Sequence, residues 1–197
     1  MLMNKIEFWL MNNPIRAFIQ GFEAKKLKSM SDLPSDKAVL EIGCGQGVGT
    51  KLIQKHFKPK SINAIDLDPQ MIRRAKRRVK APHIAFEVGD ASHLRFTDAS
   101  FDAIVDFGII HHIPNWKDAL KELHRLLKPG GQLILEDLSI DTFETRIGKI
   151  LRLFLAHPYK EMYKRKEFYE ELKNLGFKVK KQYTNPWWFG MVLRKVR

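Results

Sequence analysis

The sequence predicts an α/β protein in which helices cover both faces of a mainly parallel sheet. Five short apolar runs, typical of buried strands, alternate with amphipathic helical patterns between residues 38 and 137. A glycine-rich turn follows the first run, where open α/β sheets bind ligands. With 197 residues, 44% of them hydrophobic, the chain can form one substantial core, so we expect a single domain with additions at both ends.

The expected strands lie at residues 38–42, 62–67, 84–88, 101–106 and 132–137. Between them, the sequence predicts a helix that starts at Pro69, with Asp68 as its N-cap. A second helix follows Asn115 and is stopped by Pro129-Gly130-Gly131, with an inward stripe of Ala119, Leu120, Leu123, Leu126 and Leu127.

After residue 137 the regular alternation of predicted strands and helices ends. Residues 141–163 contain a helical apolar stripe, formed by Phe143, Ile147, Ile150, Leu151, Phe154 and Leu155. Residues 166–175 predict a helix that ends at Gly176, and residues 177–183 and 187–196 predict two closing strands.

The first 30 residues predict a helical arm that begins at Asn13-Pro14. One face of this helix is apolar, with Ile15, Phe18, Ile19 and Phe22. Two interpretations remain open. The stripe packs on the domain while the arm folds over the cleft beside the glycine turn, or the preceding Phe8, Trp9 and Leu10 enter a membrane interface.

The glycine turn lies in Val39 to Thr50, which reads V-L-E-I-G-C-G-Q-G-V-G-T. Gly43, Gly45 and Gly47 allow positive φ and a close approach of bare backbone to a ligand. The spacing is not that of a dinucleotide fingerprint, because neither register places a glycine at the last position, and no Gly-Lys-Ser/Thr follows as in a P-loop.

This turn resembles motif I of the class I S-adenosylmethionine-dependent methyltransferases. The resemblance extends to four more segments in family order: the strand that ends in Asp66, residues 86–91, residues 101–113 and residues 127–133. It implies a Rossmann-like seven-stranded sheet with helices on both faces, an N-terminal helical arm at 1–30 and a methyltransferase domain at 31–197. Residues 141–163, an insertion after the fifth strand, would be a lid over the methyl acceptor.

The resemblance implies that S-adenosyl-L-methionine is the cofactor and S-adenosyl-L-homocysteine its product. Asp66 would bind the ribose hydroxyls and Leu67 would pack on adenine, whose edge Asp90 and Ala91 would recognise. The other implied cofactor residues are Glu41, which supports the loop or the amino group, Gly43, Cys44 and Gly45 at the methionine part, and Phe107 at the methionine end.

No catalytic residue can be assigned from the sequence, and we predict no metal site. Methyl transfer from a sulfonium depends mainly on alignment of the reactants, so a base is not required for every acceptor. For a carbon acid or a phenol, His111 or His112 could take the proton. Cys44, the only cysteine, has no recognisable base nearby and is expected to act through its backbone.

The net charge of +13 is concentrated in residues 51–83 and 142–197, whereas residues 84–141 are acidic. An acidic cofactor segment suits a sulfonium cation. Several aromatic residues in the insertion favour a small, apolar acceptor, such as a lipid or quinone. The alternatives are an RNA or protein methyltransferase that uses the basic segments, with nucleic acid the less favoured partner, and a non-catalytic cofactor-binding module.

The sequence also favours a cytoplasmic protein, with peripheral contact to a membrane as a further expectation. No run of 18 apolar residues occurs, and the opening residues are interrupted by Asn4, Lys5 and Glu7, so neither a spanning helix nor a secretory signal is predicted. A single cysteine fits a reducing compartment.

Overall fold

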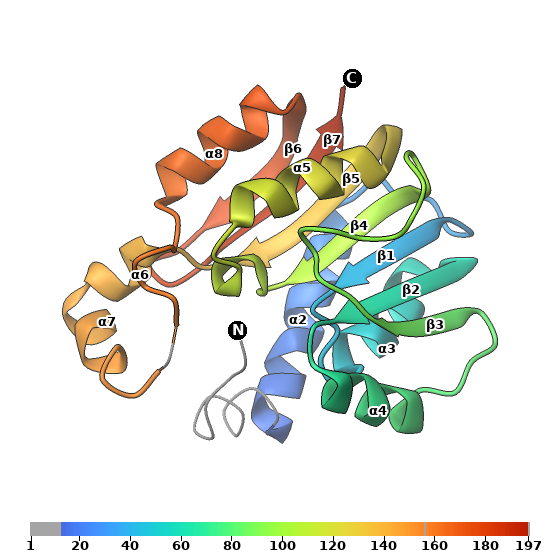
Figure 1. The fold of residues 1–197 in the computed structure, drawn as a ribbon, viewed down its shortest axis with the longest axis horizontal. Helices are drawn as coiled ribbons and strands as arrows, with labels where there is room; N and C mark the ends of the chain where they lie inside the picture. The colour runs from blue at the N-terminus through green and yellow to red at the C-terminus, as the bar shows by residue number, and fades with distance from the viewer. Residues whose placement is uncertain (1–12, 156, 197) are drawn as a thin grey trace.

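The computed structural model describes residues 13–155 and 157–196, which form a seven-stranded sheet in the order β3-β2-β1-β4-β5-β7-β6 (Figure 1). The strands are β1 (Ala38–Ile42), β2 (Ser61–Asp66), β3 (Ile84–Val88), β4 (Phe101–Phe107), β5 (Leu127–Asp137), β6 (Phe177–Thr184) and β7 (Phe189–Lys195). The first five pair in parallel, and β7 runs antiparallel to both β5 and β6. The predicted sheet is therefore confirmed.

Two apolar cores lie on opposite faces of this sheet. On one face, α5 (Trp116–Leu126) and α8 (Arg165–Asn174) bury side chains such as Leu120 and Phe168. On the other face, α2 (Pro14–Met30), α3 (Val48–Phe57) and α4 (Pro69–Arg78) bury Leu27, Ile53 and Ile72. Both faces are covered, as the continuous apolar character of β4 and β5 requires.

Local sequence signals set the helix ends. The Asn13 side chain accepts a hydrogen bond of 2.8 Å from the backbone N–H of Arg16, and the Asp68 side chain caps α4 through the N–H of Gln70. Gly176, with φ +91°, follows α8 in the left-handed conformation expected after a helix. The helix starts predicted at Pro14 and Pro69 are thus confirmed.

One strand boundary differs from the prediction. The strand expected at 132–137 begins at Leu127, so this residue starts β5 instead of continuing α5, and Pro129-Gly130-Gly131 lies inside the extended segment. The pairing of β4 with β5 shifts register between Phe101 and Ala103, which accommodates the extra residues.

The apolar stripe of the arm does not form core, contrary to the expectation for such a stripe. Ile15, Phe18 and Phe22 are 72%, 69% and 62% exposed, whereas α2 buries Ala24 and Leu27. The buried residues of α2 lie in its second half, where Leu27 joins the core with α3. The segment with Phe8, Trp9 and Leu10 lies outside the described residues.

The stripe predicted in residues 141–163 is also divided. Thr145 has extended dihedral angles and separates α6 (Ile140–Glu144) from α7 (Arg146–Leu151). Phe143 is buried with Ile140 and Met162, but Ile147, Ile150, Leu153 and Phe154 are exposed. In Figure 1, α6 and α7 lie beyond the carboxyl ends of the parallel strands. None of the helices within the described residues combines the length and apolar character needed to cross a bilayer.

Candidate functional site

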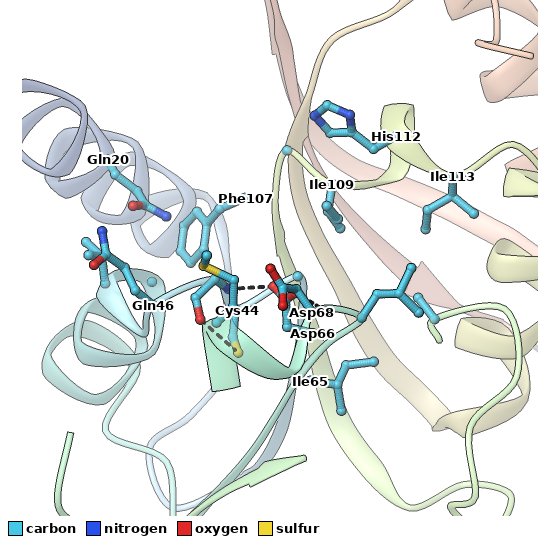
Figure 2. A pocket seen from close by; sticks show the side chains of 18 of the residues that line it. Gln20, Cys44, Gln46, Ile65, Asp66, Asp68, Phe107, Ile109, His112 and Ile113 are labelled. Carbon is cyan, nitrogen blue, oxygen red and sulfur yellow. Dashed lines mark hydrogen bonds between the residues drawn. The ribbon is translucent and has the colours of Figure 1, made fainter. Parts of the chain in front are cut away.

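A cavity of about 450 Å³ opens at the carboxyl ends of β1, β2 and β4. The strand order reverses between β1 and β4, and such a switch point is where open α/β sheets bind ligands. Figure 2 shows the site, with Cys44, Asp66 and Phe107 grouped around it. Eight of the nine predicted cofactor residues line the cavity: Gly43, Cys44, Gly45, Asp66, Leu67, Asp90, Ala91 and Phe107.

The glycine loop connects β1 to α3 through residues that adopt positive φ. Gly43, at φ +63°, passes so close to Ile109 that a Cβ would lie 2.6 Å from that side chain. Gly45, at φ +51°, has the opposite property, because a Cβ there would meet nothing within 4 Å. The loop thus leaves open space above bare backbone, which fits the methionine part of the expected cofactor.

Asp66, at the end of β2, holds the glycine loop in place. Its Oδ2 accepts a hydrogen bond of 2.8 Å from the N–H of Gly45, and its Oδ1 accepts one of 2.9 Å from the N–H of Asp68. Burial raises the pKa of Asp66, although these two backbone donors oppose the effect. A carboxylate has about four acceptor sites, so capacity for two ribose hydroxyls remains.

The predicted adenine residues lie along the same wall. Leu67 is 51% exposed and lines the cavity, which leaves an apolar surface on which a base could pack. Asp90 is exposed, and its Oδ1 accepts hydrogen bonds from the N–H and hydroxyl of Ser92. Asp90 therefore shapes its own turn as well as facing the cavity.

Glu41 is the one predicted cofactor residue outside the cavity lining. Its side chain is buried beneath the loop, where the Thr50 hydroxyl donates a hydrogen bond to Oε2. Burial raises its pKa to about 8, opposed by the Thr50 bond and reinforced by the Asp66 carboxylate. Of its two expected roles, the position of Glu41 favours support of the loop over contact with the ligand.

The thiol of Cys44 is poorly suited to nucleophilic chemistry. The side chain is buried, and this burial, together with the carboxylates of Glu41 and Asp66, raises the pKa of the thiol far above its usual range. The backbone of the residue, in contrast, is engaged, because its N–H donates a 2.9 Å hydrogen bond to the carbonyl of Ile65. Contact of the Cys44 backbone with the methionine part of the cofactor stays a prediction.

The start of the arm forms part of the cavity wall. Asn13, Pro14, Arg16, Ala17 and Gln20 line it from α2, and Figure 2 shows the Gln20 side chain near that of Phe107. One of the two interpretations of the arm places it over the cleft, but these residues are not predicted individually. Their only sequence signal is the helix start at Asn13-Pro14.

The sequence analysis did not predict several other residues that line the cavity. Gln46 and Arg78 line the cavity, and their 2.8 Å hydrogen bond joins the glycine loop to α4. Ile109, Ile113 and Pro114 line its side next to η1 (Ile110–His112). The last three belong to the segment that follows β4, whose resemblance pointed to the region but not to these side chains.

The two candidate bases lie in different surroundings. His112 lines the cavity, whereas His111 is buried behind it and its Nδ1 bonds to the carboxylate of Asp137. Burial, reinforced by His111 and His157, lowers the pKa of His112 far below its usual range. This shift favours the neutral form of the His112 imidazole.

Comparison with known proteins agrees with this arrangement. The model of the methyltransferase domain family matches residues 40–135, which include the glycine loop, Asp66, Asp90 and Phe107. Residues 40–135 belong to the methyltransferase domain family. With the seven-stranded sheet around them, they give the chain the Rossmann-like fold of class I S-adenosylmethionine-dependent methyltransferases.

The methyltransferase domain is similar to curated bacterial proteins over about half of the chain. It is 36% identical over 104 residues to the phthiotriol/phenolphthiotriol dimycocerosates methyltransferase of Mycobacterium leprae, a match covering 53% of this chain and 38% of that protein. It is also 36% identical over 101 residues to the fatty-acid O-methyltransferase of Mycolicibacterium smegmatis, covering 51% of this chain and 37% of that protein. The match thus spans less than half the length of either relative.

Solved structures share the fold of the methyltransferase domain across nearly the whole chain. A SAM-dependent methyltransferase from Aquifex aeolicus superposes with a TM-score of 0.76 and 20% identity, covering 98% of this chain and 99% of the other. An S-adenosylmethionine-dependent methyltransferase from Mesorhizobium loti gives a TM-score of 0.72 at 16% identity, covering 86% and 95%. At these identities the likeness concerns the fold.

Proposed function

We propose that the protein transfers a methyl group from S-adenosylmethionine to a small apolar acceptor, and that it does so at a membrane surface. The observation that carries the first part is the joint placement of the open backbone at Gly45 and the Asp66 carboxylate in one cavity. This arrangement offers space for a thioether-derived cation next to an acceptor for ribose hydroxyls.

In this proposal, different residues of the cavity contact different parts of the cofactor. The Gly43 to Gly45 backbone contacts the methionine part, while Asp66 binds the ribose and Leu67 packs against adenine. Asp66, Asp68 and Asp90 all face the cavity, so their negative charges favour a bound cation. Bound S-adenosylmethionine supplies an electrophilic methyl group, and the protein's task is to align the acceptor with it in a space that excludes water.

The apolar character of the acceptor is inferred from one side of the cavity and from the relatives. Ile109, Ile113 and Pro114 give that side a hydrocarbon surface next to His112. Proteins that match the methyltransferase domain are named for lipid substrates, namely phthiotriol dimycocerosates and fatty acids. We extend the substrate class, although not the individual substrates, to this chain.

The membrane part of the proposal is based on the exposed surface of the insertion. Ile147, Ile150, Leu153 and Phe154 point to solvent, and Arg146, Lys149 and Arg152 are exposed between them. An apolar surface with interspersed cations is complementary to an anionic lipid surface. The exposed face of α2 supplies further apolar side chains, including Phe18 and Phe22, whose rings contact edge to face.

The catalytic proposal is tested by binding and then by turnover. Calorimetric titration should show one equivalent of S-adenosylmethionine or S-adenosylhomocysteine bound per chain. Mass spectrometry of reactions with fatty acids, quinones, phospholipids, phenols and RNA should then show a gain of one methyl on an apolar molecule. Cofactor binding without methylation of any acceptor would favour a binding module, and methylation of RNA alone would contradict the acceptor class.

Flotation with vesicles tests the membrane part separately. The chain should float with vesicles of phosphatidylcholine and phosphatidylglycerol, and high salt should weaken binding because the cations are exposed. Leu153→Glu with Phe154→Glu should abolish flotation. Val179→Glu with Val196→Glu is the matched control, since it places two acids at exposed apolar positions outside the insertion. Equal flotation of both variants, or none by the unmodified chain, would contradict a lipid-binding insertion.

A further inference from the structure

Three histidines from two distant segments meet beside the cavity. His111 and His112 lie on η1, and His157 lies in the connection between α7 and α8. One potential ligand nitrogen from each lies within 4.8 Å of the other two. The ring centroids are separated by 4.1 Å for His111 and His112, 4.5 Å for His112 and His157, and 5.1 Å for His111 and His157.

We propose that His111, His112 and His157 bind a divalent transition-metal ion, for which Zn²⁺ is the appropriate probe. Three imidazoles with room for a fourth ligand form a known zinc-binding set. Imidazole nitrogens also suit copper, nickel and iron, so the donor set defines a class of ions. The site goes beyond methyl transfer, because it needs neither the cofactor nor the acceptor in order to form.

The hydrogen bonding of His111 supports this assignment. Its Nδ1 bonds to Asp137 Oδ1, which leaves Nε2 as the nitrogen available to an ion. Asp137 is itself held by the N–H of Leu138 at 2.7 Å and by the N–H of His111 at 3.2 Å. Histidines that bind metals commonly donate their second ring N–H to a carboxylate in this way, which fixes the ring orientation.

The surrounding charge also favours a cation. Asp106 and Asp137 are buried at the ends of β4 and β5, and the ion pairs of residues 13–155 and 157–196 bring no lysine or arginine to either. Asp106 Oδ2 has no hydrogen-bond partner among these residues. These carboxyl groups would stabilise a divalent ion held by the histidines, because no lysine or arginine competes for them among these residues.

Binding requires the nitrogens to approach one another and the rings to turn. Zinc lies about 2.0 to 2.1 Å from each imidazole nitrogen, so tetrahedral ligands are about 3.4 Å apart, compared with the limit of 4.8 Å here. His157 stacks on His111 with an interplanar angle of 15°, so its ring has to turn for its nitrogen to point at the ion. The ion would tie the insertion to η1, and because His112 lines the cavity, a fourth ligand could come from there.

Zinc titration of the full chain after removal of metals by a chelator tests the proposal. Calorimetry should show one saturable Zn²⁺ site, and Co²⁺ should give the visible absorption of tetrahedral cobalt. His157→Ala should weaken Zn²⁺ binding at least tenfold. Asp137→Asn, which removes the charge of the carboxylate bonded to His111 Nδ1, should weaken it about 10- to 100-fold.

His56→Ala is the matched control, because it removes one histidine on α3 and leaves the cluster intact. It should bind Zn²⁺ like the unmodified chain, and circular dichroism should confirm that every variant is folded. His157 is not part of either large core, so its loss should not unfold the domain. Absence of saturable binding, or equal binding by His157→Ala, would overturn the metal site while leaving the proposal for cofactor binding unaffected.

Discussion

The carboxylate of Asp66 accepts a 2.8 Å hydrogen bond from the backbone N–H of Gly45, which joins the end of β2 to the glycine loop after β1. One side chain therefore orders the loop and presents negative charge to the cavity. Loss of this side chain should affect both the shape of the loop and any ligand that needs a hydroxyl acceptor there.

Asp66→Ala should weaken S-adenosylmethionine binding by about 1 to 3 kcal/mol, because charge-assisted hydrogen bonds are lost. Asp66→Asn retains one acceptor oxygen and should lose less. Calorimetric titration measures both, and Asp98→Ala, at an exposed ion pair with Arg125, is the control. Unchanged affinity in Asp66→Ala would argue against the assignment of this acid to the ribose.

Gly43→Ala should lower the free energy of unfolding by about 2 kcal/mol, since a residue with a Cβ is strained at φ +63° and that Cβ would collide with Ile109. Gly21→Ala should do the reverse. Gly21 lies inside α2 with nothing within 4 Å of a Cβ, so the change should raise stability by about 0.5 to 1 kcal/mol. Urea unfolding curves test both signs, and equal effects would contradict the geometry of the loop.

Glu41 should make the protein less stable as pH rises. Burial raises its pKa from the ordinary value of 4.5 to about 8 in the folded chain, so between these values the folded state holds a proton that the unfolded state has released. The stabilisation is complete below about pH 4.5 and declines toward pH 8, by up to about 1.4 kcal/mol per pH unit.

Glu41→Gln mimics the protonated carboxyl group and should make this decline shallower. Glu136, whose pKa burial raises to about 9, contributes a slope of the same sign and should keep it from vanishing. Denaturant unfolding at several pH values between 5 and 8 measures the slope. An equally steep slope in Glu41→Gln would show that Glu41 ionises in the folded protein.

Asn13→Ala should weaken cofactor binding. The Asn13 side chain caps α2, and such a cap contributes about 1 kcal/mol, so its removal should fray the first turn, which lines the cavity. Ser29→Ala, near the other end of the same helix, changes an exposed hydroxyl outside the cavity lining and should bind cofactor normally. Calorimetry distinguishes the two, and equal affinities would mean that the arm does not contribute to the site.

Much of the candidate site could be predicted because it follows from short segments at the ends of adjacent strands. Eight of the nine residues implied by the resemblance line one cavity. Glu41 differs because a side chain of a buried strand can lie beneath a loop as easily as face a ligand, and that choice depends on the packing of Thr50 and Gly49 around it. The residues of α2 that line the cavity could not be predicted from the sequence, because only the packing of the whole chain places this helix beside the cavity.

The sequence by itself determined the order of strands and helices, the glycine loop and the closing strand pair. These features follow from local periodicity, capping residues and backbone freedom at glycine, which act over a few residues. The tertiary structure decided which apolar faces become core: the stripe of α2 and that of α7 have helical periods but remain exposed, since no element within residues 13–155 and 157–196 covers them. It also brought His157 to His111 and His112, because contacts between distant segments depend on how the whole chain packs.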